Sequence, residues 1–348
     1  MAEPLKNQFG ARTVERIAAS LPVDAPGFAA ECLEDFDALE LMDRGRRVAD
    51  VMARHLDPDP ASAVRQVAAA IGAERPVGMD GFFYNPHSFF IATYGLPAFE
   101  ESMSAMYRLT KAFTAEFCIR AFISEYPETM VQLRTWAADP DEHVRRLVSE
   151  GSRPRLPWAA QLPQFRANPE PVIALLQLLK DDESEYVLRS VGNNLNDISK
   201  DHPERVLEVA AEWYPGRERL VRRGLRTLIK AGDPEALAIL GYGRSEVVAT
   251  AALPPNLAIG DSLRLAIQLS GHDRVLVDVV VDFVKTGGGT GRKVFKGGEV
   301  EVDGRAVIRR SISFAQHSTR KHHPGPHRIS VLINGREQQL GVVRVVQG

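Results

Sequence analysis

The stretch that decides the fold is Asp139-Pro-Asp-Glu-His-Val-Arg-Arg-Leu-Val148, a turn followed by an amphipathic helical pattern. Related strings recur at Val187-Leu-Arg-Ser-Val191 and Val221-Arg-Arg-Gly-Leu225, each after a turn of its own. Prolines that can occupy the first turn of a helix open the successive units, at Pro127, Pro169, Pro203 and Pro234. A pair of helices that recurs roughly every 30–45 residues predicts a HEAT-like α-solenoid.

The hydrophobic pattern changes after Leu253-Pro-Pro-Asn256. Residues 262–269 and 274–283 alternate between apolar and polar, and Asn334-Gly335 is a strong hairpin signal. Further alternating runs cover 305–314, 328–333 and 339–346. About seven short strands in this length predict an all-β immunoglobulin-like sandwich. We therefore expect a helical domain over residues 1–250 and a β domain over residues 256–348.

Charge is distributed unevenly along a chain whose net charge is only −2. Residues 256–348 hold 14 Lys and Arg against 8 Asp and Glu, whereas residues 1–255 hold 29 against 37. A basic module on a mildly acidic body indicates a polyanionic partner.

Nothing in the chain indicates secretion or a membrane. The N-terminus lacks a charged-then-apolar signal pattern, and no apolar run approaches about 18 residues. Cys32 and Cys118 form no CxxC pair and lie in apolar helical patterns, so we expect reduced core residues. These features predict a soluble, cytoplasmic protein, and nothing in them requires a dimer.

Arginines and a tryptophan lie within and just after the deciding stretch. Arg146, Glu150 and Arg153 recur at helical spacing, and Arg155 and Trp158 follow in a proline-broken extension. Guanidinium groups on a concave helical face suit phosphate contacts, and a tryptophan there can pack on a sugar or base. The alternative is a solvated, salt-bridged helix in which Trp158 is a spacer between repeats.

The equivalent face of the next repeat carries poor helix formers. These are Asn193, Asn194, Asn196 and Asp197, which predict either amide donors and a carboxylate aimed at a ligand or hydrogen bonds between repeats. Glu116 lies in the apolar segment 113–119, which we interpret as helix. Its carboxylate is either an amphipathic edge or an acid that faces a groove.

Two C-terminal features resemble ligand sites but lack the required context. The segment 287–293 is glycine-rich and basic, but no Ser or Thr follows its lysine, so we interpret it as a basic hairpin loop rather than a P-loop. His317, His322, His323 and His327 have no cysteine partner, and a basic surface loop is favoured over a metal site. We expect no metal.

Several motifs resemble the AlkC-type DNA glycosylases, over residues 1–245. They are Leu5-Lys-Asn-Gln-Phe-Gly10, Val14-Glu-Arg-Ile-Ala18, Leu39-Glu-Leu-Met-Asp-Arg-Gly45, Tyr94-Gly-Leu96, Leu109-Thr-Lys-Ala-Phe-Thr-Ala-Glu-Phe117, the stretch 145–158 and Asn193-Asn-Leu-Asn-Asp197. A subset of that family carries a C-terminal immunoglobulin-like domain. The resemblance implies a monofunctional, cofactor-free enzyme that removes cationic alkylated bases, mainly 3-methyladenine and 3-methylcytosine, from double-stranded DNA.

The resemblance also implies roles for individual residues. Glu116, Glu150 and Asp197 are the expected catalytic carboxylates, and Trp158 and Phe117 would contact the lesion nucleotide. A cationic base is already a good leaving group, so carboxylates need only stabilise the sugar cation and position water. The expected DNA contacts are Arg146, Arg153, Arg155, Asn193, Asn194, Lys285, Arg292, Lys293, Lys296, Arg320 and Lys321. Two alternatives remain open: a catalytically silent DNA-binding relative, and a helical-repeat scaffold for protein interactions.

Overall fold

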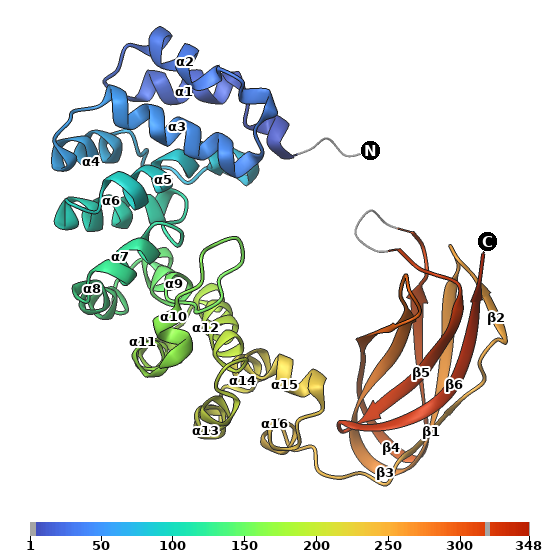
Figure 1. Ribbon diagram of the computed structural model, residues 1–348. Helices are drawn as coiled ribbons and strands as arrows, with labels where there is room; N and C mark the ends of the chain where they lie inside the picture. The colour runs from blue at the N-terminus through green and yellow to red at the C-terminus, as the bar shows by residue number, and fades with distance from the viewer. Residues whose placement is uncertain (1–4, 317–320, 348) are drawn as a thin grey trace. The chain divides into compact units, whose positions relative to one another are not determined.

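The computed structural model describes residues 5–316 and 321–347 of the chain (Figure 1). Contacts divide it into two compact units, Met1–His202 and Pro203–Gly348, which we treat one at a time. Among the described residues, no helix combines the length and apolar character needed to cross a membrane.

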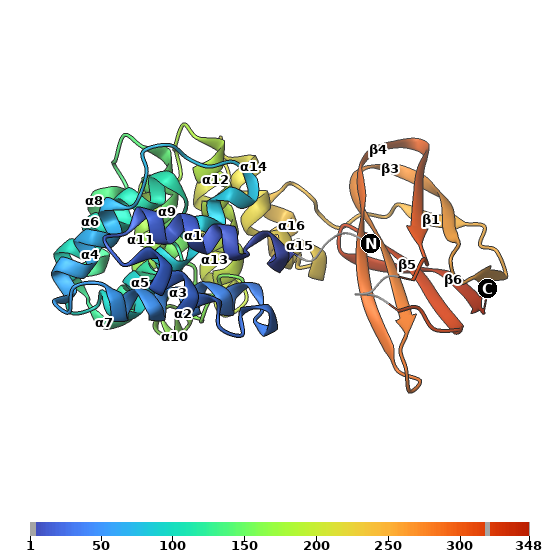
Figure 2. The ribbon, with the colours of Figure 1, turned by 90° about the horizontal axis from the view of Figure 1, so that it is seen from above.

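The first unit is built from helices stacked in sequence order (Figures 1 and 2). α8 packs against α9, α11 against α12, and α9 against α12, so neighbouring helix pairs share a continuous core. The predicted helical repeat is confirmed here. The elements are η1 Leu5–Gln8, α1 Ala11–Ser20, α2 Ala25–Leu33, η2 Phe36–Ala38, α3 Leu41–His55, α4 Pro60–Ala69, η3 Gly78–Tyr84, α5 Asn85–Tyr94, α6 Phe99–Ala112, α7 Ile119–Glu125, α8 Glu128–Trp136, α9 Glu142–Gly151, α10 Pro163–Ala167, α11 Glu170–Leu179 and α12 Glu185–Ile198.

The helix starts follow the local sequence signals. Pro127 and Pro169 immediately precede α8 and α11. The Asp141 carboxylate accepts the backbone N–H of His143 at the start of α9, and Ser184 does the same for Tyr186 at the start of α12. These caps satisfy N–H groups that have no partner within the helix, which fixes where each second helix begins.

The second unit contains four helices and six strands among its described residues. The strands form one sheet in the order β1-β3-β5-β6-β2, with β4 paired to β3. The bounds are α13 Pro203–Trp213, α14 Glu218–Gly224, α15 Arg226–Ala231, α16 Pro234–Ile239, β1 Val248–Ala251, β2 Asn256–Ala258, β3 Ser262–Val284, β4 Thr290–Ser313, β5 Gly325–Ile333 and β6 Arg336–Val346.

The expectation of about seven short strands is wrong, because β3 and β4 form one long hairpin of 23 and 24 residues. The ladder continues through the gap between the two predicted strands, 262–269 and 274–283. Gly271 pairs there with Gly304, and both residues have positive φ angles. Both halves of this hairpin pack into the same apolar core, so the sheet curls around that core. The strand-rich fold is confirmed, but separation into two sandwiched sheets is not.

Two expectations about the loops of this unit have different outcomes. The hairpin between β3 and β4 and the Asn334-Gly335 turn are confirmed. The surface-loop interpretation of the histidines is wrong for His322 and His327, which are buried against Phe283 and Phe314. Packing against aromatic rings, which the local sequence does not encode, explains their burial. His317 and Arg320 lie outside the described residues.

Candidate active site

Three of the predicted site residues converge from separate elements of the first unit. Glu150 lies on α9 and Asp197 on α12, while Glu116 lies in the turn between α6 and α7. The helical interpretation of Glu116 is therefore wrong. α6 ends at Ala112, and the Thr114 hydroxyl accepts the N–H of Glu116 at 3.3 Å, a local bond that favours a turn over a helix.

Two arginines alternate with the three carboxylates. Arg146 Nη1 donates to Glu116 Oε2, and its Nη2 lies 3.6 Å from Glu150 Oε1. Arg153 Nη1 donates to Glu150 Oε1 at 2.5 Å, and its Nη2 lies 2.7 Å from Asp197 Oδ2. The side chains form one continuous row, Glu116–Arg146–Glu150–Arg153–Asp197, from the α6–α7 turn across α9 and the loop after it to α12.

Burial makes this row an electrostatic unit. Arg153 and Asp197 expose 8% and 2% of their side chains, and Lys200 Nζ donates to Asp197 Oδ1 at 2.8 Å. Burial lowers the pKa of Arg146 and Arg153, but the neighbouring carboxylates outweigh it and raise the pKa of both. Arg146 and Arg153 thus bind carboxylates in this structure, which favours a carboxylate-holding role over the expected phosphate contacts.

The carboxylates differ in how many of their oxygens are occupied. Both oxygens of Asp197 accept hydrogen bonds, and Glu150 Oε2 accepts the Ser190 hydroxyl at 2.6 Å. The bonds to Glu116 all go to Oε2, from Arg146 and from the Thr114 hydroxyl. Glu116 Oε1 is therefore the carboxylate oxygen of this row that accepts no hydrogen bond from a described residue.

The asparagine-rich segment joins helices rather than facing outward. Asn194 is completely buried, and its Nδ2 donates to the Ser149 carbonyl at 2.7 Å. Asn196 is also buried, and Asn193 is half-buried. The hydrogen-bonding alternative between repeats thus holds for Asn194, whose burial does not fit the expected DNA contact.

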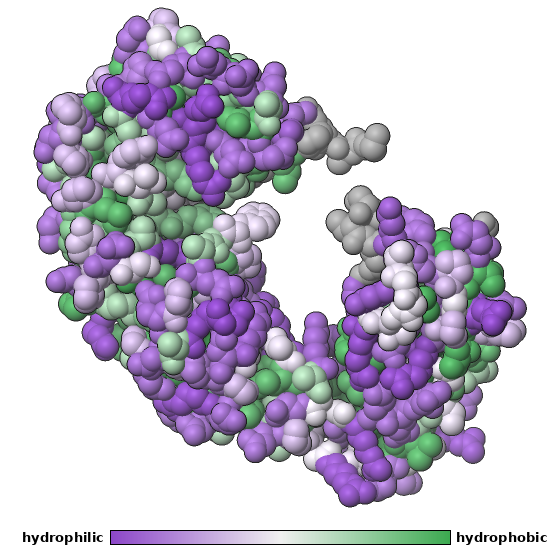
Figure 3. Space-filling view, in the orientation of Figure 1, coloured by the Kyte–Doolittle hydropathy of each residue, from purple (hydrophilic) through white to green (hydrophobic). Residues whose placement is uncertain are grey.

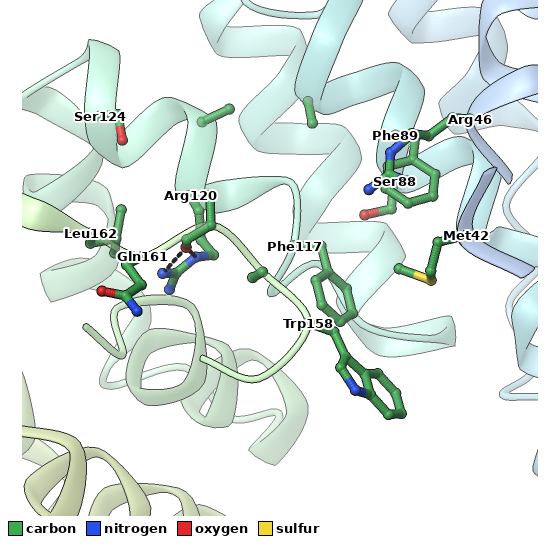
Figure 4. A pocket seen from close by; sticks show the side chains of 14 residues that line it. Met42, Arg46, Ser88, Phe89, Phe117, Arg120, Ser124, Trp158, Gln161 and Leu162 are labelled. Carbon is green, nitrogen blue, oxygen red and sulfur yellow. Dashed lines mark hydrogen bonds between the residues drawn. The ribbon is translucent and has the colours of Figure 1, made fainter. Parts of the chain in front are cut away.

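Trp158 stands apart from the row on the loop between α9 and α10. Trp158 is 82% exposed, and its φ of +64° places the backbone in the left-handed region, which residues with bulky side chains rarely adopt. Trp158 and Phe117 line a cavity of about 260 Å³ together with Met42, Phe89 and Arg120. Figure 4 shows the two rings near each other, with the indole directed away from the loop. Backbone strain of this kind is concentrated at functional sites in proteins.

Arg155 lies in the same loop and is held by a different acid. Its guanidinium makes two hydrogen bonds to Asp201, at 2.6 and 2.8 Å, and leaves 27% of the side chain exposed. Arg166 also reaches Asp201, at 3.2 Å. Arg155 is thus the most accessible of the three arginines expected to contact phosphate.

The predicted cations of the second unit lie on its surface. Lys285 is in the β3–β4 loop, and Lys293 and Lys296 follow on β4. Arg292 pairs with Glu337 at 2.9 Å. Lys321 is also exposed. Figure 3 shows mainly hydrophilic residues on the face drawn.

Three residues that hold the row and the Trp158 loop in place are not among the predicted site residues. Thr114 and Ser190 orient two acids of the row, and Arg120 binds the backbone of the Trp158 loop. An arginine within the apolar run Cys118-Ile-Arg-Ala-Phe122 was the available signal. Across the described ranges, no three His, Cys, Asp or Glu residues gather in a way that could hold a metal ion.

Comparison with known proteins gives this arrangement a context. Residues 110–224 match the model of the DNA alkylation repair enzyme family, and residues 246–347 match the C-terminal Ig-like domain of the uncharacterised protein YhaZ. The row of acids and arginines and Trp158 all lie within the first match. The fold and this site therefore define a protein of DNA alkylation repair.

Full-length relatives narrow the class. The chain is 38% identical over 314 residues to the uncharacterized protein YhaZ of Bacillus subtilis, covering 87% of each chain. It is 32% identical to the Pseudomonas fluorescens alkylpurine DNA glycosylase AlkC bound to DNA containing an abasic site analog. That superposition has a TM-score of 0.87 and covers 99% of this chain and 100% of the other. The chain belongs to the AlkC-type family of alkylpurine DNA glycosylases.

Proposed function

We propose that this glycosylase hydrolyses the N-glycosidic bond of cationic alkylated bases, chiefly 3-methyladenine and 3-methylcytosine, in double-stranded DNA. The observation that carries the proposal is the row of Glu116, Glu150 and Asp197 in a unit that also presents the exposed Trp158. We further propose a monomeric, cytoplasmic protein with a catalytic domain over residues 1–250 and a DNA-clamping immunoglobulin-like domain over residues 256–348.

The proposed substrates lose their base without needing a general acid to protonate it. Adenine or cytosine methylated at N3 carries a positive charge in the nucleotide and leaves as a neutral molecule. The difficult part is the sugar, which acquires oxocarbenium character as the bond from C1′ to the base breaks. Carboxylates near this cation stabilise it electrostatically, as they do in glycoside hydrolysis.

Glu116 is best placed to act on the reacting atoms. Its Oε1 is available, whereas Arg146 and Thr114 hold Oε2 and so fix the orientation of the carboxylate. In the proposed step, Glu116 positions a water whose oxygen bonds to C1′ as the base departs. The water proton passes to the carboxylate and then to solvent, leaving an abasic site.

Glu150 and Asp197 have a supporting role in this proposal. Their oxygens are bound by Arg153, Ser190 and Lys200, so they hold the two arginines in line and contribute negative charge. Trp158 would pack against the lesion nucleotide with Phe117 behind it. Arg155 and the surface lysines of the second unit would contact phosphates without reading sequence.

Single-turnover base release tests the proposal. Duplexes containing 3-methyladenine or 3-methylcytosine would be incubated with excess wild type, Glu116→Gln or Asp182→Asn. Asp182 is the matched control, because its buried carboxylate also binds an arginine, Arg145, at 2.7 Å but lies outside the row. We expect Glu116→Gln to slow release by roughly 100-fold or more, by analogy with the loss of one electrostatic group from an active site.

The possible results separate the three functions considered. Release by wild type and by Asp182→Asn, lost in a Glu116→Gln protein that still binds DNA, supports the proposal. Binding of DNA by wild type without release of either base would identify a silent relative. Neither binding nor release would favour a protein-interaction scaffold.

A further inference from the structure

Arg120 lies beneath the Trp158 loop and is 5% exposed. It belongs to α7, and its guanidinium lies among backbone carbonyls of the chain between α9 and α10. Nη1 donates to the carbonyls of Gly151 and Arg153, at 3.1 and 2.7 Å. Nε and Nη2 donate to the carbonyl of Ala160, at 3.1 and 2.5 Å. One side chain thus joins the start of the loop to its end.

The bonding of Arg120 differs from that of the arginines in the row. None of the acids in the described ranges forms a salt bridge with it, so its hydrogen bonds go to backbone oxygens, and Glu116, Asp197 and Glu150 favour its charge only from beyond salt-bridge distance. Burial lowers the pKa of Arg120 to about 10, and the side chain keeps its proton at neutral pH. The loop carbonyls and the guanidinium therefore depend on each other, because either would be costly to bury alone.

The residues between the two bound ends form a tight loop. The N–H of Leu162 donates to the carbonyl of Pro154 at 3.1 Å, and Leu156 is buried. Trp158 occupies the exposed part of this loop in its left-handed conformation. A strained residue retains such a conformation only when its surroundings determine it, and the exposed indole supplies few contacts of its own.

We propose that Arg120 is a positioning residue that holds the Trp158 loop in its DNA-ready conformation before DNA binds. This inference rests on the proposed function, in which Trp158 contacts the lesion nucleotide. The role assigned to Arg120 acts through the loop: it fixes both ends, so that the direction of the indole is set in the free protein. The enzyme therefore meets DNA with a preformed aromatic projection instead of ordering the loop on contact.

Two substitutions separate this role from a purely electrostatic one. Arg120→Lys keeps a positive charge but cannot span three carbonyls, whereas Arg120→Met removes both charge and donors. Thr129→Val is the matched control, since Thr129 on α8 is completely buried and its hydroxyl donates to the carbonyl of Phe122 on α7, the helix of Arg120, rather than to the Trp158 loop. Full-length proteins would be compared at a temperature where all three remain folded.

Two readouts report the loop directly. Trypsin cleavage at the Arg155–Leu156 bond, followed by mass spectrometry, measures how often the loop opens. Acrylamide quenching of tryptophan fluorescence follows Trp158 selectively, because Trp136 and Trp213 are 6% and 0% exposed, and the anisotropy of the emission adds a measure of tryptophan mobility. A third readout is the single-turnover rate of base release, measured beside the dissociation constant for undamaged duplex.

We expect both Arg120 variants to gain trypsin cleavage and lose anisotropy, with base release slowed roughly 10- to 100-fold by misplacement of Trp158. The dissociation constant should change by less than about threefold, since phosphate contacts dominate the binding of undamaged DNA. The inference is overturned if cleavage and anisotropy match those of Thr129→Val, or if Arg120→Lys behaves as wild type. Should wild type release no base, the proposed function fails, yet the cleavage and fluorescence results still decide the role of Arg120.

Discussion

Replacing Trp158 with glycine should leave the protein about as stable as wild type while removing much of its activity. Three terms decide the stability. Relief of the left-handed backbone strain contributes about 1–3 kcal/mol in favour of the variant. Glycine costs about 0.5–1 kcal/mol through the greater freedom of the unfolded chain.

The third term is the loss of buried apolar area, and it is small because the residue is 82% exposed. The buried remainder of a tryptophan is roughly 45 Å², which corresponds to about 1 kcal/mol. The terms nearly cancel, so the free energy of unfolding should stay within about 1 kcal/mol of wild type. Replacing the fully buried Trp213 with alanine should instead cost about 3–5 kcal/mol.

Urea unfolding followed by circular dichroism measures the stability difference, and single-turnover base release measures the activity. Loss of one stacking contact, worth about 1–3 kcal/mol, should reduce the rate or the affinity for lesion DNA by roughly 5- to 150-fold. Trp158→Phe should recover part of that loss. A Trp158→Gly protein as destabilised as Trp213→Ala, or one with full activity, would refute the reasoning.

Three further predictions concern other parts of the molecule. Burial raises the pKa of Cys32 and Cys118 to about 12, so neither thiol should react with a disulfide reagent at pH 8 until the protein is unfolded in urea. Hydrogen bonds from Arg155 and then Arg166 hold the pKa of Asp201 well below its ordinary 3.8. The ion pairs of Asp201 therefore stabilise the fold fully above pH 3.8, and this stabilisation is lost as the pH falls below that value. The stability difference between wild type and Asp201→Asn, measured by urea unfolding, should shrink in acid. Triple replacement of Lys285, Lys293 and Lys296 by alanine should weaken binding to any duplex and reduce the slope of log affinity against log salt by about 2–3, with an unchanged slope counting against phosphate contact.

Much of the architecture was predictable because it depends on local signals. Pro127 and Pro169 mark where helices begin, and the alternation in residues 262–269 marks a strand, since these signals act through the backbone of the same few residues. The interruption at Gly271 suggested two separate strands, 262–269 and 274–283, where the structure has one. Whether a glycine ends a strand or bends it depends on what lies opposite, and here Gly304 continues the ladder.

The candidate site was predictable as a set of residue types but not as an arrangement. Arg146 and Arg153 suggested phosphate contacts because an unpaired arginine and a paired one look the same in a sequence. Their partners, Glu116 and Asp197, lie 30 and 44 residues away. Glu116 itself is placed by the Thr114 hydroxyl, which accepts its N–H and favours a turn over a helix. Apolar periodicity does not show which of the two forms.

By itself, the sequence determined the helical repeats, the β-rich end and the family, because periodicity, capping residues and motifs are properties of neighbouring positions. Only the tertiary structure decided which charges meet, which histidines are buried and how Trp158 is held. Those outcomes depend on contacts between elements distant in the chain: the guanidinium of Arg120 acts on carbonyls 31 to 40 residues away. Burial then determines what each contact does, since a pairing worth little in water becomes decisive once solvent is excluded.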